Sequence, residues 1–274
     1  MAVLGQIILS SWVFMGLSLL MFAPLERLMP ARQNRGRAPW SDWMYFWVNP
    51  TIGAWGALTF IALLGATIRA LLPAWVLHWT AGRPVAWQLF LAVLLAELWG
   101  YWAHRLAHAI PWLWRFHRVH HSIEEMRWIS AHRQHPIDVI WLIAGANLPA
   151  FALGVNLRPL AAFIVFERCY TVFLHANLDC SYGLADHFLA SPRFHHWHHD
   201  AGEVGLNRNF AGIFSVLDWI FGTYHPPLFP PEKFGDAAPM ARGYINQIFA
   251  TPPPAPTLKQ GRANAQSSGE TSSS

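Results

Sequence analysis

The sequence predicts an all-α fold: an integral membrane helical bundle of four to five spans, with a cytoplasmic, helical, histidine-rich cap. Two observations favour this class. The 274-residue chain is 54% hydrophobic and only 12% charged, about half the charged fraction that is usual in soluble proteins. Its histidines are also concentrated, because all but His78 and His225 fall between positions 104 and 199.

Apolar runs supply the predicted spans. A helix needs about 20 apolar residues to cross a bilayer, and five runs come close to or exceed this length: 3–22, 44–68, 85–103, 138–155 and 159–176. The last two are short enough to form a shallow hairpin instead of two crossings, so four and five spans both fit. No Lys or Arg precedes the first run, which argues against a cleaved signal peptide.

Basic residues predict the orientation of the spans. Four arginines lie in the loop 23–41, only Arg69 and Arg83 lie in 69–84, and five arginines lie in 104–133. Cytoplasmic loops carry the excess of Lys and Arg. We therefore expect an outside N-terminus, an external 69–84 loop and cytoplasmic histidines.

Composition also excludes some functions. Two cysteines, Cys169 and Cys180, are too few for a disulfide framework or a four-sulfur metal site. The formal charge of +4 suggests contact with anionic lipid headgroups rather than nucleic acid.

Histidine spacing predicts a metal centre. The segment HRLAH places two histidines at i and i+4, and FHRVHH and HHWHH each place three at i, i+3 and i+4. On a helix such residues share a face, while adjacent histidines diverge by about 100°, so one can bind one ion and its neighbour a second. Neutral imidazole is the commonest protein metal ligand, and buried imidazoles need partners.

The number of histidines predicts two ions. A single zinc takes about four protein ligands at most, and eight to ten imidazoles exceed that. Imidazole suits iron, copper, nickel and zinc, so the spacing alone does not name the metal.

The order of the motifs resembles a known family. HRLAH, FHRVHH, RQHP, HANL and PRFHHWHH, followed by NFAGIFSVLDWIFGTY, are similar to the histidine boxes of the fatty acid hydroxylase/sterol desaturase superfamily of membrane-bound di-iron enzymes. The resemblance covers residues 97–225. It implies an O2-dependent non-haem di-iron hydroxylase that acts on an unactivated C–H bond of a lipid, such as an acyl chain, sterol or carotenoid.

The resemblance also implies a domain division and a ligand set. Membrane spans would occupy 1–84, the catalytic domain 85–230, and a C-terminal extension 231–274, disordered from about 252. Two iron ions would be bound, with O2 as co-substrate. The implied ligands are His104, His108, His117, His120, His121, His135, His175, His195, His198 and His199. His132 is a further candidate, and His196 stands where the family often has a non-ligand.

Acidic residues in or near the spans have separate interpretations. Glu97 lies seven residues before His104, on nearly the same helix face. A mid-span acid costs about 2.5–3.5 kcal/mol on insertion scales, so we expect Glu97 to support a metal-bound histidine. Glu167 adjoins Arg168 and is interpreted as half of a local ion pair, and Asp218 as a structural residue.

Partners and alternatives complete the predictions. The chain has no fused cytochrome b5-like domain, so we expect a separate ferredoxin- or cytochrome b5-like electron donor with its reductase, and a lipid substrate from the bilayer (the inner membrane if bacterial). Lipid desaturation by the same family is the alternative reaction. A metal transporter is disfavoured, because transporter sites lie near the bilayer midplane on broken helices, whereas these histidines lie mostly past the ends of the spans.

Overall fold

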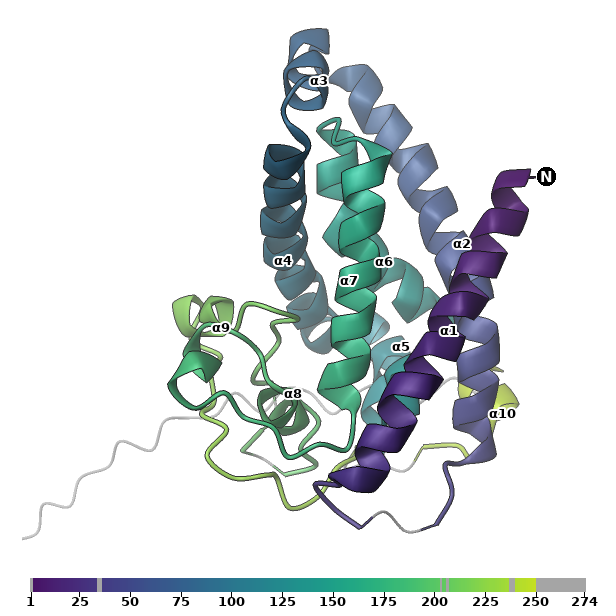
Figure 1. Cartoon of the computed structure of the whole chain (residues 1–274), viewed down its shortest axis with the longest axis vertical. Coiled ribbons are helices and arrows are strands. Elements are labelled where there is room, and N and C mark those ends of the chain that lie inside the picture. The colour runs from purple at the N-terminus through teal and green to yellow at the C-terminus, as the bar shows by residue number, and fades with distance from the viewer. Residues whose placement is uncertain (1, 34–35, 203, 206, 237–239, 250–274) are drawn as a thin grey trace, which may run out of the picture.

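The computed structural model describes residues 2–249, apart from 34–35, 203, 206 and 237–239 (Figure 1). Within these residues the chain forms α- and 3-10 helices and two isolated bridges, with no strand. The all-α prediction is confirmed. The disorder expected from about residue 252 lies outside the described residues.

Five long helices coincide with the five apolar runs: α1 (Ala2–Leu28), α2 (Trp40–Leu71), α4 (Val85–Ala109), α6 (Pro136–Ala152) and α7 (Leu157–His175). A short helix, α3 (Ala74–Ala81), occupies the loop between α2 and α4. Prolines set the breaks, because the residue before a proline is biased away from the helical conformation. Leu72 accordingly ends α2 with ψ 144° in front of Pro73.

Small residues bring the long helices together. A Cβ at Gly145 of α6 would lie 2.5 Å from the Ala103 side chain of α4, and one at Gly56 of α2 would lie 2.5 Å from Ile140 of α6. Such residues let helix backbones approach closely inside membranes. Helix α6 therefore packs against both α2 and α4, and α7 follows it after a short turn in which Gly154 has φ +90°.

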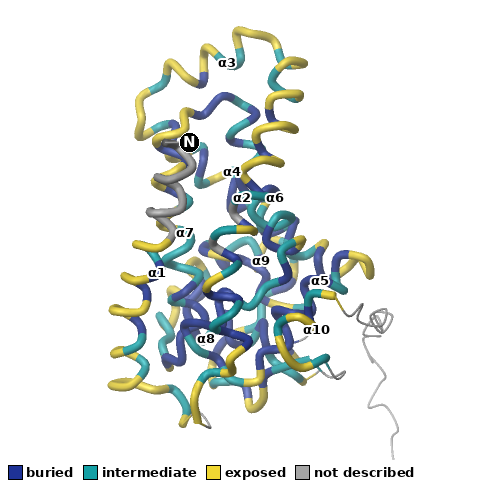
Figure 2. The backbone as a smooth tube through the Cα atoms, turned by 90° about the vertical axis from the view of Figure 1, so that its right-hand side faces the viewer, coloured by how far each residue is buried: buried dark blue, intermediate teal, exposed yellow. Residues whose placement is uncertain are grey.

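The long helices expose apolar side chains. Helices α2 (32 residues) and α4 (25 residues) are long and apolar enough to cross a membrane, and α6 is a shorter apolar helix. Exposed positions recur along the long helices, and Figure 2 shows them as yellow segments of the backbone. The large hydrophobic residues that are exposed include Leu20, Leu63, Phe90, Leu94, Val165 and Phe166. Many exposed large apolar side chains along helices of spanning length are typical of contact with a membrane or a partner. The prediction of four to five spans stays a prediction.

The cap gathers at one end of the bundle, where α4 and α7 end (Figure 1). Its elements are α5 (Pro111–His121), η1 (Trp128–His132), η2 (Gly183–His187), α8 (Pro192–His198), α9 (Val216–Ile220) and α10 (Tyr244–Phe249). Ile110, extended in front of Pro111, separates α4 from α5. Helix α10 contacts α2, where the Tyr45 hydroxyl donates a hydrogen bond to Gln247 Oε1 at 3.1 Å.

Candidate metal centre

Four helix ends carry the clustered histidines. The first histidine box, HRLAH (His104 and His108), lies in the last turns of α4, and the second, FHRVHH (His117, His120 and His121), lies in the last turns of α5. His175 ends α7. The third box occupies α8, with His199 as its C-cap. Because all four helix ends meet in the cap, segments far apart in sequence present imidazoles to one another.

The histidines sort into two groups in the described part of the chain. The first consists of His104, His108, His117, His121 and His198, and the second of His120, His175, His195 and His199. Within each group the candidate ligand atoms lie within 4.8 Å of one another. Adjacent histidines belong to different groups, as their 100° offset on a helix predicts. His121 and His198 belong to the first group, and their neighbours His120 and His199 belong to the second.

Distances inside the groups fit shared ions. In the first group, His117 Nε2 lies 3.1 Å from His104 Nε2 and 3.2 Å from His121 Nε2. In the second, His175 Nε2 lies 3.0 Å from His120 Nε2 and 3.1 Å from His195 Nε2. Two nitrogens that bind one ion at about 2.0–2.1 Å each would lie about 3 Å apart. Each group could therefore hold one ion without large rearrangement.

Six of the nine grouped rings have their outer nitrogen anchored by an oxygen atom. Carbonyl and carboxylate oxygens only accept, so Nδ1 must carry the proton and Nε2 must present its lone pair to the group. The Nδ1 contacts to oxygen are His104 to Phe210 O (2.8 Å), His198 to Arg208 O (2.8 Å), His175 to Thr171 O (2.8 Å), His120 to Arg133 O (3.1 Å), His108 to Asn207 Oδ1 (3.2 Å) and His117 to Asp138 (3.0 Å).

Asp138 is a functional candidate that sequence reasoning missed. Its two oxygens lie 3.0 and 3.1 Å from His117 Nδ1, and both residues are buried. A carboxylate behind a metal-ligating histidine orients the ring and raises its basicity. An acid at the start of an apolar run was the available signal, since burying it is costly without a partner.

A loop at 207–214 supplies further anchors. Asn207 and Asn209 have φ of 58° and 56°, a left-handed conformation that Asn tolerates. Asp218 accepts hydrogen bonds from the backbone N–H groups of Phe210 and Ala211, both at 2.8 Å. These contacts agree with the structural role expected for Asp218. Backbone carbonyls leave no sequence signal, so their contribution could not be foreseen.

Glu97 contacts the same loop rather than a histidine. Its carboxylate accepts from the N–H groups of Ile213 and Phe214, both at 2.9 Å. It therefore holds the segment next to Phe210, whose carbonyl accepts from His104. Any support of the metal site by Glu97 would act through this loop, one step further removed than predicted.

The electrostatic environment favours neutral imidazole. Burial, with added repulsion from neighbouring imidazoles, holds the pKa values of six histidines well below the usual 6.5: His117, His120, His121, His195, His198 and His199. Neutral imidazole is the metal-binding form. Among the described residues His108 Nε2, His198 Nε2 and both nitrogens of His199 are buried without a hydrogen-bond partner. Such atoms are costly to bury unless something binds them, and a metal ion would do so.

Three histidines of the predicted motifs, His132, His135 and His196, lie outside both groups. His135, expected as a ligand, is the N-cap of α6: its Nδ1 accepts from Ile137 N–H, and its Nε2 donates to the Ile248 carbonyl at 3.1 Å. Both nitrogens are thus engaged elsewhere. His132 packs edge-on against Phe46, and His196 Nε2 lies 3.1 Å from the Ala176 carbonyl. The position of His196 agrees with its interpretation as a non-ligand.

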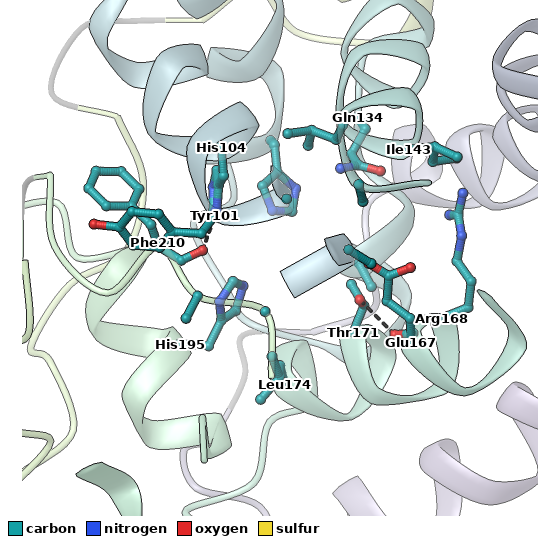
Figure 3. A pocket seen from close by; sticks show the side chains of 18 of the residues that line it. Tyr101, His104, Gln134, Ile143, Glu167, Arg168, Thr171, Leu174, His195 and Phe210 are labelled. Carbon is teal, nitrogen blue, oxygen red and sulfur yellow. Dashed lines mark hydrogen bonds between the residues drawn. The ribbon is translucent and has the colours of Figure 1, made fainter. Parts of the chain in front are cut away.

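A cavity of about 150 Å³ opens beside both groups, between α4, α6 and α7 (Figure 3). Histidines of the first group (His104, His117) and of the second (His120, His175, His195) line one part of it. Apolar side chains line much of the rest: Ala96, Leu142, Ile143, Ala146 and Leu174. A chain of methylene groups in this cavity would lie next to both groups of nitrogens.

Comparison with known proteins agrees with this geometry. The model of the fatty acid hydroxylase family matches residues 89–223, which include every histidine of the two groups. The ornithine lipid hydroxylase OlsE of Rhizobium tropici is 32% identical over 242 residues, covering 82% of this chain and 70% of the relative.

Other relatives are similar over shorter lengths. The alkylglycerol monooxygenase of Danio rerio is 32% identical over 143 residues, or 52% of this chain and 31% of the relative. A putative methylsterol monooxygenase of Dictyostelium discoideum is 31% identical over 132 residues, or 47% of this chain and 48% of the relative. The chain thus spans less than half the length of these two. No solved structure matches it.

Proposed function

Since the chain belongs to the fatty acid hydroxylase family, we propose that it is a membrane-bound di-iron oxygenase that hydroxylates an unactivated C–H bond of a lipid, using O2 and external electrons. The observation that carries the proposal is the pair of histidine groups beside one cavity, with outer ring nitrogens held by oxygen acceptors. A structural site would not need an adjoining apolar cavity.

The donor set fits redox-active iron. The nine imidazoles form two groups, and each group would hold one ion. Zinc would not serve the reaction, because it has no redox chemistry. When bound, two irons would supply O2 activation and share the electrons that the reaction consumes. The chain itself orients six of the nine rings through their Nδ1 contacts. Leu142, Ile143 and Leu174 would position a methylene group and exclude water.

The names of the relatives support hydroxylation of a lipid. OlsE is named as an ornithine lipid hydroxylase, and the animal relative as an alkylglycerol monooxygenase. We infer by similarity that the substrate of this chain is also a lipid and that oxygen insertion, rather than desaturation, is its reaction.

Lipid analysis with labelled oxygen tests the reaction. Cells with and without the gene are grown under heavy-isotope O2, and their lipids are compared by mass spectrometry. We expect a lipid that gains one labelled oxygen atom only when the gene is present. A lipid that instead loses two hydrogen atoms would identify a desaturase. If no lipid changes and the reconstituted protein takes up metal, the transporter alternative would be favoured.

We further propose that the cap faces the cytoplasm, where a separate ferredoxin- or cytochrome b5-like donor would reach it. Single-cysteine variants, with Cys169 and Cys180 replaced, test this orientation. Glu124→Cys lies in an exposed part of the cap and Ala81→Cys near the far end of the bundle. An impermeant reagent outside the cell should label Ala81→Cys only. Labelling of Glu124→Cys would reverse the orientation and place the donor on the other side.

A further inference from the structure

Two charged side chains line the cavity beside the metal centre. Glu167 and Arg168 lie on α7, on the opposite side of the pocket from Tyr101 and Phe210 in Figure 3. Both are only partly exposed, in a helix whose neighbouring surface is apolar. A charge in such surroundings is costly unless it has a partner.

The expected local ion pair does not explain them. Adjacent helical residues do not face each other, and among the described residues no N–O distance within 4.0 Å joins Arg168 to Glu167 or to any other acid. The Arg168 guanidinium likewise makes no hydrogen bond to a described residue. The Glu167 carboxylate has the Asn147 amide of α6 as its neighbour. The two charges therefore attract each other through space without a direct ion-pair contact, and both line the cavity.

The two charges lie at a fixed distance from the histidines. Arg168 and His175 are seven residues apart on α7, which is nearly two turns, so they share a face about 10 Å apart along the axis. Both line the same cavity, as does Thr171 between them. The cavity thus has a doubly charged part and a metal-side part, joined by apolar wall.

We propose that Glu167 and Arg168 form a headgroup subsite for a zwitterionic lipid, with Arg168 binding an anionic group, carboxylate or phosphate, and Glu167 binding an ammonium group. This inference rests on the proposed function, which requires a lipid in this cavity. A neutral sterol or carotenoid would offer neither side chain a group of opposite charge. The subsite therefore selects lipids whose oxidised carbon lies within about two helical turns of a zwitterionic group.

Binding of matched lipids to the full-length, iron-loaded protein in nanodiscs tests the ligand side. The probes are an acyl amino-acid lipid with free carboxylate and amine, its methyl ester, its N-acetyl derivative, phosphatidylethanolamine and diacylglycerol. A hydrogen bond to a charged group is worth enough to change affinity about tenfold or more. We expect the ester and the N-acetyl derivative to bind at least about tenfold more weakly than the parent lipid.

The two zwitterions then distinguish the anion. Tighter binding of the amino-acid lipid assigns a carboxylate to Arg168, and tighter binding of phosphatidylethanolamine assigns a phosphate. Binding of the methyl ester or of diacylglycerol as tight as that of both zwitterions would overturn the subsite.

Crossed variants test the protein side. Arg168→Gln should weaken binding of the parent lipid about tenfold or more and leave binding of the methyl ester unchanged. Glu167→Gln should likewise weaken binding of the parent lipid about tenfold or more, and should leave binding of the N-acetyl derivative unchanged. Arg158→Gln, exposed near the start of α7, is the matched control and should bind all probes as the parent protein does. A uniform loss for every probe would overturn the assignment. If a variant fails to fold, the ligand comparison on the unaltered protein decides.

The two proposals fail in different ways. Selective binding of zwitterions without oxygen insertion would refute the proposed function and leave the subsite standing. Equal binding and hydroxylation of neutral and zwitterionic lipids would refute the subsite alone.

Discussion

The two histidine groups differ in how the protein holds them. Four of the five first-group rings have an Nδ1 contact to an oxygen, and three of these acceptors, on Asn207, Arg208 and Phe210, lie in one loop. Within the described part of the chain, the second group has such a contact only at His120 and His175, and that of His175 lies within its own helix.

The difference indicates unequal preorganisation. The loop and Asp138 fix the first group in advance of metal binding, because each anchored ring has one tautomer and one orientation. Among the described residues, His195 Nδ1 and both nitrogens of His199 have no partner. The second group therefore depends more on its ion for order. The predictions below test this contrast, from the largest expected effect to the smallest.

Removal of adjacent histidines should empty different sites. His198→Ala takes a ligand from the first group and His199→Ala one from the second. We expect each variant to fall from two irons to about one and to lose turnover, since both groups line the cavity. Metal analysis with Mössbauer spectroscopy should show complementary remaining signals. Identical signals in the two variants would contradict the division into two groups.

The carboxylate behind His117 should matter for the first group only. Asp138→Asn removes the charge that polarises the ring, and loss of such a partner typically lowers metal affinity or activity 10- to 100-fold. Metal titration should show that one site is weakened. The spectroscopic signal of that site should be the one that His199→Ala retains, which is the signal of the first group. Asp179→Asn, which removes a partly exposed pair with Arg193, is the control and should change neither site. Weakening of the second site would mean that the groups are not independent.

Chelation should remove the ions in sequence. The less anchored second group is expected to release its ion first, with an affinity lower by about tenfold, the lower end of what outer hydrogen bonds contribute. Timed samples during chelator treatment should pass through a one-iron state that resembles His199→Ala. Passage through a state resembling His198→Ala would reverse the ranking.

The loop itself can be weakened without touching a ligand. Asp218 accepts from two backbone N–H groups and from Thr223 Oγ1, whereas the single acceptor oxygen of Asn cannot replace both carboxylate oxygens. Asp218→Asn should cost about 1–3 kcal/mol of stability and disturb the signal of the first group while sparing the second. Thermal unfolding and spectroscopy of the iron-loaded protein measure both. An unchanged first-group signal would separate the loop from the metal site.

Local patterns in the sequence predicted much of this arrangement. Each long helix was predicted by an apolar run of nearly membrane-spanning length, because the length and composition of such a run can be read directly from the chain. The spacing of His120 and His121 predicted their divergence, because the helical turn fixes it. The assignment of these histidines as metal ligands, which the family resemblance implies, stays a prediction.

What sequence reasoning could not reach depends on distant contacts. His135 is engaged by a carbonyl 113 residues away, and Glu97 by N–H groups 116 and 117 residues away. Asp138 meets His117 only because α6 packs beside α5 in the cap. Such pairings arise from tertiary packing and leave no periodic signal in the chain.

The smallest effect is expected at the histidine inside the third box that joins neither group. His196 is buried, and its Nε2 faces the Ala176 carbonyl instead of an ion. His196→Ala removes one buried hydrogen bond and leaves a small void, which should cost about 1–3 kcal/mol of stability. Both irons should remain, and turnover should change only modestly, because no ligand or anchor of either group is altered. Iron content and product formation, measured beside His198→Ala and His199→Ala, provide the test. Loss of an iron from His196→Ala, with both retained in His199→Ala, would shift the ligand register of the third box and dissolve the contrast between the groups.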